Sequence, residues 1–217
     1  MFLHQHPYQP FIQKDTTKLI VGTLPPPRFS VGQLLERDVD FCYGSCHNSL
    51  WRYIDKIHGL NLTYYNSTDA IEERKQFLIK NKIGICDIVE RAERDKIDAS
   101  DLGMKNIVLR DLIGFLKQFP NVNTLLFIGG RSKNGPEYFF RKQLKQYDIS
   151  LKVIDDTMPR IHEFEVDKRP VKTISLISSS GAANLSIGSN QEYKRIKAKD
   201  KAFTTFDFRV LQYRQFL

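Results

Sequence analysis

The sequence has few cysteines and no long apolar run. Cys42, Cys46 and Cys86 are an odd number in neither a disulfide-like nor a zinc-like spacing, and three are too few for a four-cysteine iron–sulfur cluster. We therefore expect reduced thiols, no metal and no other cofactor. No apolar run approaches the roughly 18 residues of a membrane span, and the first residues lack a secretory pattern. These absences predict a cytoplasmic protein without a membrane partner.

Nothing in the sequence divides it into parts. The 217 residues contain no internal repeat, low-complexity linker or sharp composition shift, so we expect one domain over 1–217, acting as a monomer. Lys and Arg number 33 against 25 Asp and Glu, a formal net charge of +8. Such an excess of positive charge favours a polyanionic partner such as nucleic acid.

Hydrophobic patterns predict strands that alternate with helices. Short apolar runs closed by polar, glycine or proline residues are typical of buried strands. They occur at 18–23, 83–88, 123–130, 150–155 and 172–178. Apolar residues recurring three and four apart predict helices at 49–58, 68–80, 105–119 and 136–147. The alternation predicts a three-layer α/β/α sandwich with a central, mainly parallel sheet of four to five strands.

In such a sheet the ligand site lies beyond the carboxyl ends of the strands, so the loops there are of most interest. The loop GTLPPP (22–27) combines a glycine that permits close backbone approach with three stiffening prolines, although such a turn can also simply redirect the chain. Further along, Phe41 and Tyr43 offer flat faces for stacking on a base, and Gly44 leaves room beside one. Asn48 brings an acceptor and two donors, and it also suits the N-cap of the helix expected from residue 49.

These segments resemble a known family. GTLP at 22–25 after an apolar strand, followed by YGSCHNSLW at 43–51, is similar to the first active-site region of the uracil-DNA glycosylase superfamily. The likeness is greatest to the hypoxanthine-DNA (deoxyinosine) and mismatch-specific glycosylase branches. SSSGAAN at 178–184 lies where the family's second motif follows the last strand, and weaker likenesses cover 85–106 and 125–140. The segments occur in family order.

The resemblance implies a monofunctional DNA glycosylase that hydrolyses the N-glycosidic bond of a damaged or deaminated base, hypoxanthine or uracil, flipped out of DNA. Tyr43 falls at the family's base-stacking aromatic, and Asn48 at its active-site asparagine, so Asn48 is the candidate catalytic residue. The base-binding candidates are Gly22, Thr23, Leu24, Pro25, Phe41, Tyr43, Gly44 and His47. The DNA-binding candidates are Ser178, Ser179, Ser180, Gly181, Ala182 and Asn184, with Lys194 and Arg195 in the basic run 192–203. The resemblance also implies insertion into the duplex near 182–185.

The chain also departs from the family. The first motif has no carboxylate or asparagine where more active branches hold their water, the second has no histidine, and Cys46 replaces an expected proline. The acids Asp87, Asp98 and Asp101 are expected to act as caps and structural hydrogen-bond acceptors. We expect a disordered terminus around His4 and His6.

Two alternatives remain open. The first is a catalytically silent module of the same fold that binds DNA or an unusual base without cleaving it. The missing activating residues favour this reading. The second is an α/β enzyme that acts on free nucleotides or another small molecule, with the serine loop holding a phosphate.

Overall fold

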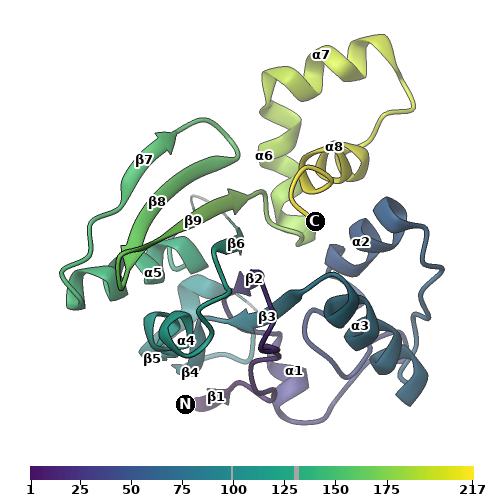
Figure 1. Ribbon diagram of the computed structural model, residues 1–217. Helices are drawn as coiled ribbons and strands as arrows, with labels where there is room; N and C mark the ends of the chain where they lie inside the picture. The colour runs from purple at the N-terminus through teal and green to yellow at the C-terminus, as the bar shows by residue number, and fades with distance from the viewer. Residues whose placement is uncertain (99, 130–131) are drawn as a thin grey trace.

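The computed structural model describes residues 1–98, 100–129 and 132–217. A six-stranded sheet of order β3-β2-β6-β9-β8-β7 lies at its centre (Figure 1). Four neighbouring strands are parallel: β3 (Ile83–Asp87), β2 (Lys18–Gly22), β6 (Thr124–Ile128) and β9 (Arg169–Leu176). Two antiparallel strands complete the sheet: β8 (Arg160–Val166) and β7 (Lys152–Asp155). The predicted α/β fold with a mainly parallel sheet is confirmed.

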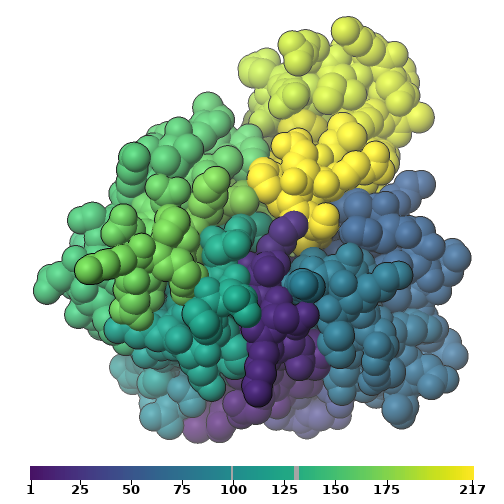
Figure 2. Space-filling model, viewed as in Figure 1, coloured from purple at the N-terminus to yellow at the C-terminus, as the bar shows by residue number. Residues whose placement is uncertain are grey.

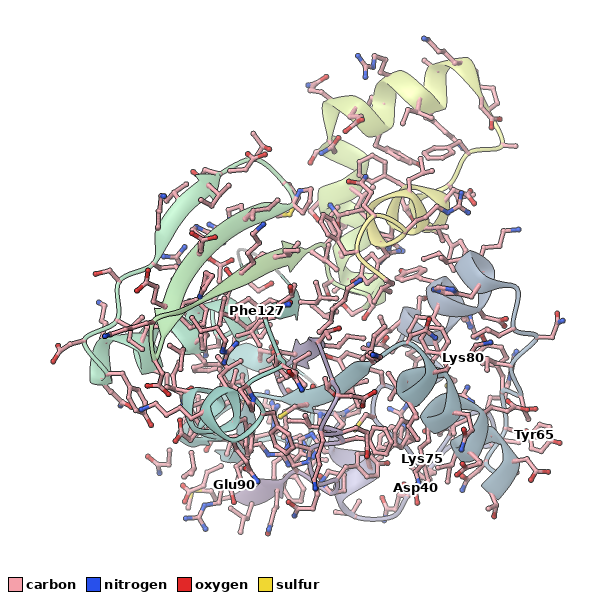
Figure 3. The ribbon with its side chains drawn as sticks, viewed as in Figure 1. Asp40, Tyr65, Lys75, Lys80, Glu90 and Phe127 are labelled. Atoms are coloured by element: carbon pink, nitrogen blue, oxygen red, sulfur yellow. The ribbon has the colours of Figure 1, made fainter. Side chains whose placement is uncertain are left out.

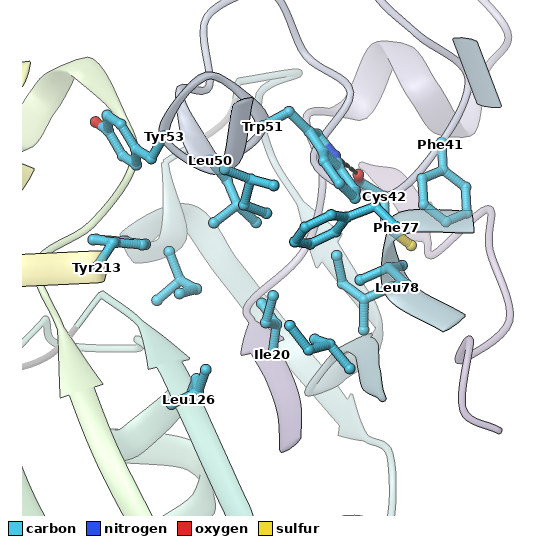
Figure 4. Packing of buried hydrophobic residues seen from close by; sticks show 14 of the residues in the cluster. Ile20, Phe41, Cys42, Leu50, Trp51, Tyr53, Phe77, Leu78, Leu126 and Tyr213 are labelled. Atoms are coloured by element: carbon cyan, nitrogen blue, oxygen red, sulfur yellow. Dashed lines mark hydrogen bonds between the residues drawn. The ribbon is translucent and has the colours of Figure 1, made fainter. Parts of the chain in front are cut away.

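Apolar side chains cover both faces of this sheet. Successive residues of a strand point to opposite faces, so Ile20 and Leu126 belong to one core while Leu19 and Phe127 belong to the other. The first core is covered by α2 (Leu50–His58), α3 (Thr68–Lys80) and α8 (Thr205–Tyr213). The second is covered by α4 (Leu112–Gln118) and α5 (Pro136–Gln146). Figure 4 shows the first core, and Figure 3 places Phe127 inside the molecule.

A second, three-stranded antiparallel sheet includes the N-terminus. Its order is β1-β4-β5, formed by β1 (Phe2–Gln5), β4 (Val89–Arg94) and β5 (Met104–Leu109). The expectation of a disordered terminus was wrong, because His4 and His6 are buried and His4 Nδ1 accepts a hydrogen bond from Arg94 Nε at 2.8 Å. The helix expected over 105–119 was wrong in its first part, which is strand β5.

The strand expected at 150–155 differs from the prediction in its environment. All four residues of β7 are exposed, and the strand is an antiparallel edge rather than a buried parallel strand. Its partner β8 was not anticipated, and this hairpin brings the sheet to six strands instead of four to five. The last residue of the strand expected at 123–130 lies outside the described residues.

The part of the chain that follows β9 is helical. After β9 come the short 3-10 helix η2 (Gly181–Ala183), α6 (Asn184–Ser189) and α7 (Gln191–Lys199). Figure 2 shows the yellow-green region of α7 projecting at the top. The remaining short elements are α1 (Pro27–Ser30) and the 3-10 helix η1 (Asp101–Gly103). Among the described residues, no helix is long and apolar enough to cross a membrane.

Candidate active site

A cavity of about 300 Å³ opens at the carboxyl ends of the parallel strands. β2 ends in it at Gly22, β3 at Asp87 and β6 at Ile128, and Ser178 enters it two residues after β9. Its volume lies at the lower end of the roughly 300–1,000 Å³ of small-ligand sites. The lining residues are Gly22, Thr23, Leu24, Pro25, Pro26, Phe29, Phe41, Tyr43, Gly44, Ser45, His47, Asn48, Asp87, Asp101, Ile128, Ser178, Ser179, Ser180 and Gly181.

The structure brings together most of the residues singled out in the sequence. Asn48 and all eight base-binding candidates line this one cavity, although the first loop and the segment 41–48 lie about 20 residues apart in the chain. The serine loop 178–181, which comes much later in the sequence, forms another part of the cavity wall. Ala182 and Asn184 lie beyond the cavity, in η2 and α6, and Lys194 and Arg195 are exposed on α7.

Tyr43 forms part of the cavity wall, and its hydroxyl is buried beside Gly22. A Cβ added to Gly22 would lie 2.0 Å from Tyr43 Oη and 2.6 Å from Asp87 Oδ1, so only glycine permits this approach. Burial raises the pKa of the Tyr43 phenol well above its ordinary value, and neighbouring Asp87 adds to the shift. Tyr43 therefore stays neutral. Its backbone has a left-handed φ of 58°, a conformation that is strained for a tyrosine and that often marks functional sites.

A partly buried ion pair fixes the loop that presents Tyr43. Arg28 donates two hydrogen bonds to Asp38, at 2.6 and 2.9 Å, and a third to Ser45 Oγ at 2.8 Å. Asp38 also accepts from the backbone N–H of Cys46 and of Leu35. Burial alone would raise the pKa of Asp38, but these hydrogen bonds outweigh it and hold that pKa well below its usual range. The pair was not anticipated, since nothing in the sequence marks residues 28 and 38 as partners.

Gly44 is required for a different reason from the one expected. Its missing side chain leaves space for the backbone, because a Cβ there would lie 1.8 Å from the carbonyl oxygen of Val39. The backbone N–H of Val39 donates to the Gly44 carbonyl at 2.8 Å, which closes the turn. Phe41 lines the cavity but packs in the core at ring-centroid distances of 6.1 Å from Phe11 and 6.2 Å from Trp51. Figure 4 shows Phe41 and Trp51 in that core.

Asn48 combines a structural contact with a free donor. Its Oδ1 accepts from the backbone N–H of Leu50 at 2.9 Å, a local contact two residues along the chain. The N-cap of α2 is Ser49, one residue later than expected. Within the described chain, no group hydrogen-bonds its Nδ2. The backbone of Asn48 forms a bridge to Ser180, and the N–H of Ser49 donates to the Ser179 carbonyl at 3.0 Å. The catalytic candidate is thus joined directly to the serine loop.

The serine loop is held from behind by Arg209 of α8. This buried guanidinium donates to the carbonyl oxygens of Ser178 and Ser180, at 3.1 and 2.9 Å, and to Asn184 Oδ1. The hydroxyl of Ser178 donates to Ser180 Oγ at 3.1 Å, which leaves the Ser180 hydrogen free for another acceptor. Ser179 is buried, and the side-chain oxygen of Asn184 is engaged within the protein.

Two of the three acids set aside in the sequence line the cavity. Each is a hydrogen-bond acceptor, as expected: Asp87 Oδ2 lies 3.0 Å from His6 Nε2, and Asp101 Oδ2 accepts from Thr23 Oγ1 at 3.3 Å. Burial raises the pKa of Asp101 to about 6, and the negative charge of Asp87 adds to the shift, while Thr23 and Arg94 oppose it. A perturbed carboxyl group in a cavity is a mark of functional sites.

The cavity contains no evident site for a metal ion. In the ranges 1–98, 100–129 and 132–217, no three His, Cys, Asp or Glu side chains converge in a way that would hold one. The three cysteines are free thiols, of which Cys42 and Cys86 are buried.

Among known proteins, the chain matches a solved structure but no family model and no curated sequence. The chain is similar to the solution NMR structure of a putative uracil DNA glycosylase from Methanosarcina acetivorans, with a TM-score of 0.55 and 18% sequence identity. The match covers 95% of this chain and 98% of that one. The two proteins share a fold. At this identity, the likeness concerns the fold alone.

Proposed function

We propose that this protein is a monofunctional DNA glycosylase, which hydrolyses the N-glycosidic bond of a damaged or deaminated base flipped out of DNA. The observation that supports it most is the meeting of Tyr43, Asn48 and the serine loop in one cavity of a fold shared with a putative uracil DNA glycosylase. Hypoxanthine and uracil are the bases to which the sequence resemblance points.

The chemistry needs stabilisation of two charges more than a strong nucleophile. As the bond breaks, the sugar gains oxocarbenium character and the departing base becomes negative. The neutral ring of Tyr43 offers a face on which the base stacks. The free Nδ2 of Asn48 donates to an oxygen or nitrogen of the base, where the negative charge develops.

The surface beside the cavity suits a DNA duplex. Leu185, in the first turn of α6 directly after the serine loop and η2, is 88% exposed. An apolar side chain held so far into solvent fits insertion between base pairs, at the place that the resemblance implies. The free hydroxyl hydrogen of Ser180 is available to a phosphate oxygen.

A lesion panel tests the proposal. Duplexes containing hypoxanthine, uracil, xanthine or a modified cytosine are incubated with the protein and then treated with alkali, which breaks the strand at an abasic site. We expect strand breaks with hypoxanthine or uracil duplexes and none with undamaged DNA. Binding that persists while every lesion stays intact would favour the silent module.

Asn48→Asp separates the catalytic role of Asn48 from its structural one. The aspartate keeps an oxygen for the Leu50 N–H but loses the Nδ2 donor. We expect single-turnover excision to slow by about 100-fold or more, the usual effect of removing a donor to a developing anion. Asn190→Asp, the same change at the N-cap of α7, is the matched control. A full rate in Asn48→Asp would place the catalytic group elsewhere.

A further inference from the structure

The first loop contains no carboxylate or carboxamide, yet the cavity that it lines does contain a carboxylate positioned beside it. Asp101, from η1, lies within hydrogen-bond distance of Thr23, in the loop directly after β2. We propose that Asp101 is the general base that activates the hydrolytic water, in place of the missing group of the first loop. This inference rests on the proposed glycosylase function.

The placement of Asp101 is fixed from two sides. Thr23 Oγ1 donates to Oδ2 at 3.3 Å, and Asn134 Nδ2 donates to the Asp101 carbonyl at 3.1 Å. The Thr23 loop is itself tied to the second sheet, because the Thr23 carbonyl accepts from the N–H of Val89, in β4, at 3.0 Å. Oδ1 of Asp101 has no hydrogen-bond partner in the described part of the chain. One carboxylate oxygen is therefore anchored, and the other is free to accept from a water.

Asp87, the other acid of the cavity, is less suited to this role. The Tyr8 backbone N–H donates to His6 Nδ1 at 3.0 Å, which leaves the imidazole proton on Nε2, directed at Asp87 Oδ2. Its second oxygen is fully buried beside Gly22 and the Tyr43 hydroxyl. Asp87 thus supports the wall formed by Tyr43, whereas Asp101 keeps an oxygen for substrate water.

The proposed step conserves atoms and charge. The bond between the sugar C1′ and the base nitrogen breaks, and its electron pair leaves with the base. A water oxygen forms the new bond to C1′, and one water proton passes to Asp101 Oδ1. The base anion, stabilised by Asn48, takes a proton from solvent, and Asp101 returns its proton to solvent. No metal or redox cofactor is required.

The surroundings of Asp101 predict the pH range of this step. Burial raises its pKa to about 6, so the carboxylate is the major form at neutral pH and is lost as the pH falls through about 6. Excision should therefore fall on the acid side. Among the described residues, the charged or titratable groups around it are Arg94 and Asp98, His4 behind Arg94, and Asp87, Tyr43 and His47 around the cavity.

The test is the pH profile of single-turnover excision, on the lesion that the panel identifies, from about pH 5 to about pH 9. Wild-type protein should show a limb that falls below about pH 6, and Asp101→Asn should be slower by about 100-fold or more at neutral pH, with that limb absent. Asp95→Asn removes an exposed carboxylate of the same loop and should behave as wild type. His47→Gln should keep the limb, because the proposal assigns the limb to Asp101 and not to the imidazole of His47, which also lines the cavity.

A stability measurement separates the loss of a base from the loss of the fold. A carboxyl group with a raised pKa in the folded state favours folding only while protonated, so ionised Asp101 destabilises the protein above about pH 6. Asp101→Asn should melt at the wild-type temperature or higher at pH 8.

A rate for Asp101→Asn within about threefold of wild type, or a limb that vanishes in His47→Gln, overturns the assignment. Wild-type protein that excises no lesion instead overturns the glycosylase function itself, and the base with it.

Discussion

At the scale of the residue, Gly22 shows how tightly the side chains of the cavity wall pack against the backbone. Its alanine variant would place a methyl group 2.0 Å from Tyr43 Oη and 2.6 Å from Asp87 Oδ1, so the tyrosine must move. We expect Gly22→Ala to lower the free energy of unfolding by about 1–3 kcal/mol, the usual cost of overpacking, and to slow excision. Urea unfolding and single-turnover rates measure the two effects.

Gly188 provides the control for Gly22. It lies in α6 with no heavy atom within 4 Å of an added Cβ, so Gly188→Ala should leave excision unchanged and stabilise the helix by about 0.5–1 kcal/mol. Equal behaviour of the two variants would show that the contact between Gly22 and Tyr43 does not shape the cavity.

The same scale shows what the sequence could reveal about the site. Tyr43 and Asn48 stand in one short run, and a local pattern is enough to single them out. Asp101 was given only a structural role, because its partner Thr23 is 78 residues away and its perturbed pKa arises from burial that a linear sequence does not display. Arg209, which holds the serine loop from the C-terminal helix, was missed for the same reason.

At the scale of the element, α6 presents a testable wedge. Leu185 is 88% exposed, so Leu185→Ala removes almost no packing, and the melting temperature should not change. If the leucine fills the space of an extruded base, excision from duplex DNA should fall by about 10-fold or more, because insertion offsets an unstacking cost of a few kcal/mol. Excision from a single strand, where there is no duplex to open, should change little.

Leu211→Ala offers a matched control, since Leu211 is also exposed, on the neighbouring helix α8. Equal losses on duplex and single-stranded substrates in Leu185→Ala would contradict insertion and point to a contact with the base itself.

Elements were predictable where pattern and packing agree. The helix expected at 68–80 is α3 with the same bounds, because one apolar stripe meets one sheet face. The β7–β8 hairpin was harder to anticipate. The apolar residues Val153 and Ile154 suggest a buried strand, but β7 is exposed along its whole length. Strand β5 was taken for the start of a helix because its apolar residues continue the spacing of α4, and only pairing with β4 decides otherwise.

At the scale of the whole molecule, the net charge of +8 becomes informative only through its distribution. Lys194 and Arg195 are exposed on α7, which begins two residues after α6 ends and contacts it. Lys197 differs, because its ammonium group donates to the carbonyl oxygens of Lys201 and Phe203 and thereby stabilises the helix exit. Lys194 and Arg195 are therefore the two cations of this run that we test for neutralising phosphates.

Salt dependence of binding tests this distribution. Affinity for a lesion duplex should fall linearly on logarithmic axes as salt rises, and a variant combining Lys194→Gln with Arg195→Gln should reduce the slope by about 2, equally for damaged and undamaged DNA. Lys80→Gln with Lys117→Gln is the control: both lysines are exposed where α3 and α4 lead into the amino ends of β3 and β6, opposite the cavity, as Figure 3 shows for Lys80 on α3. That pair should leave the slope unchanged.

Affinity that hardly varies with salt would favour a small-molecule ligand, because only a polyanion releases many counterions on binding.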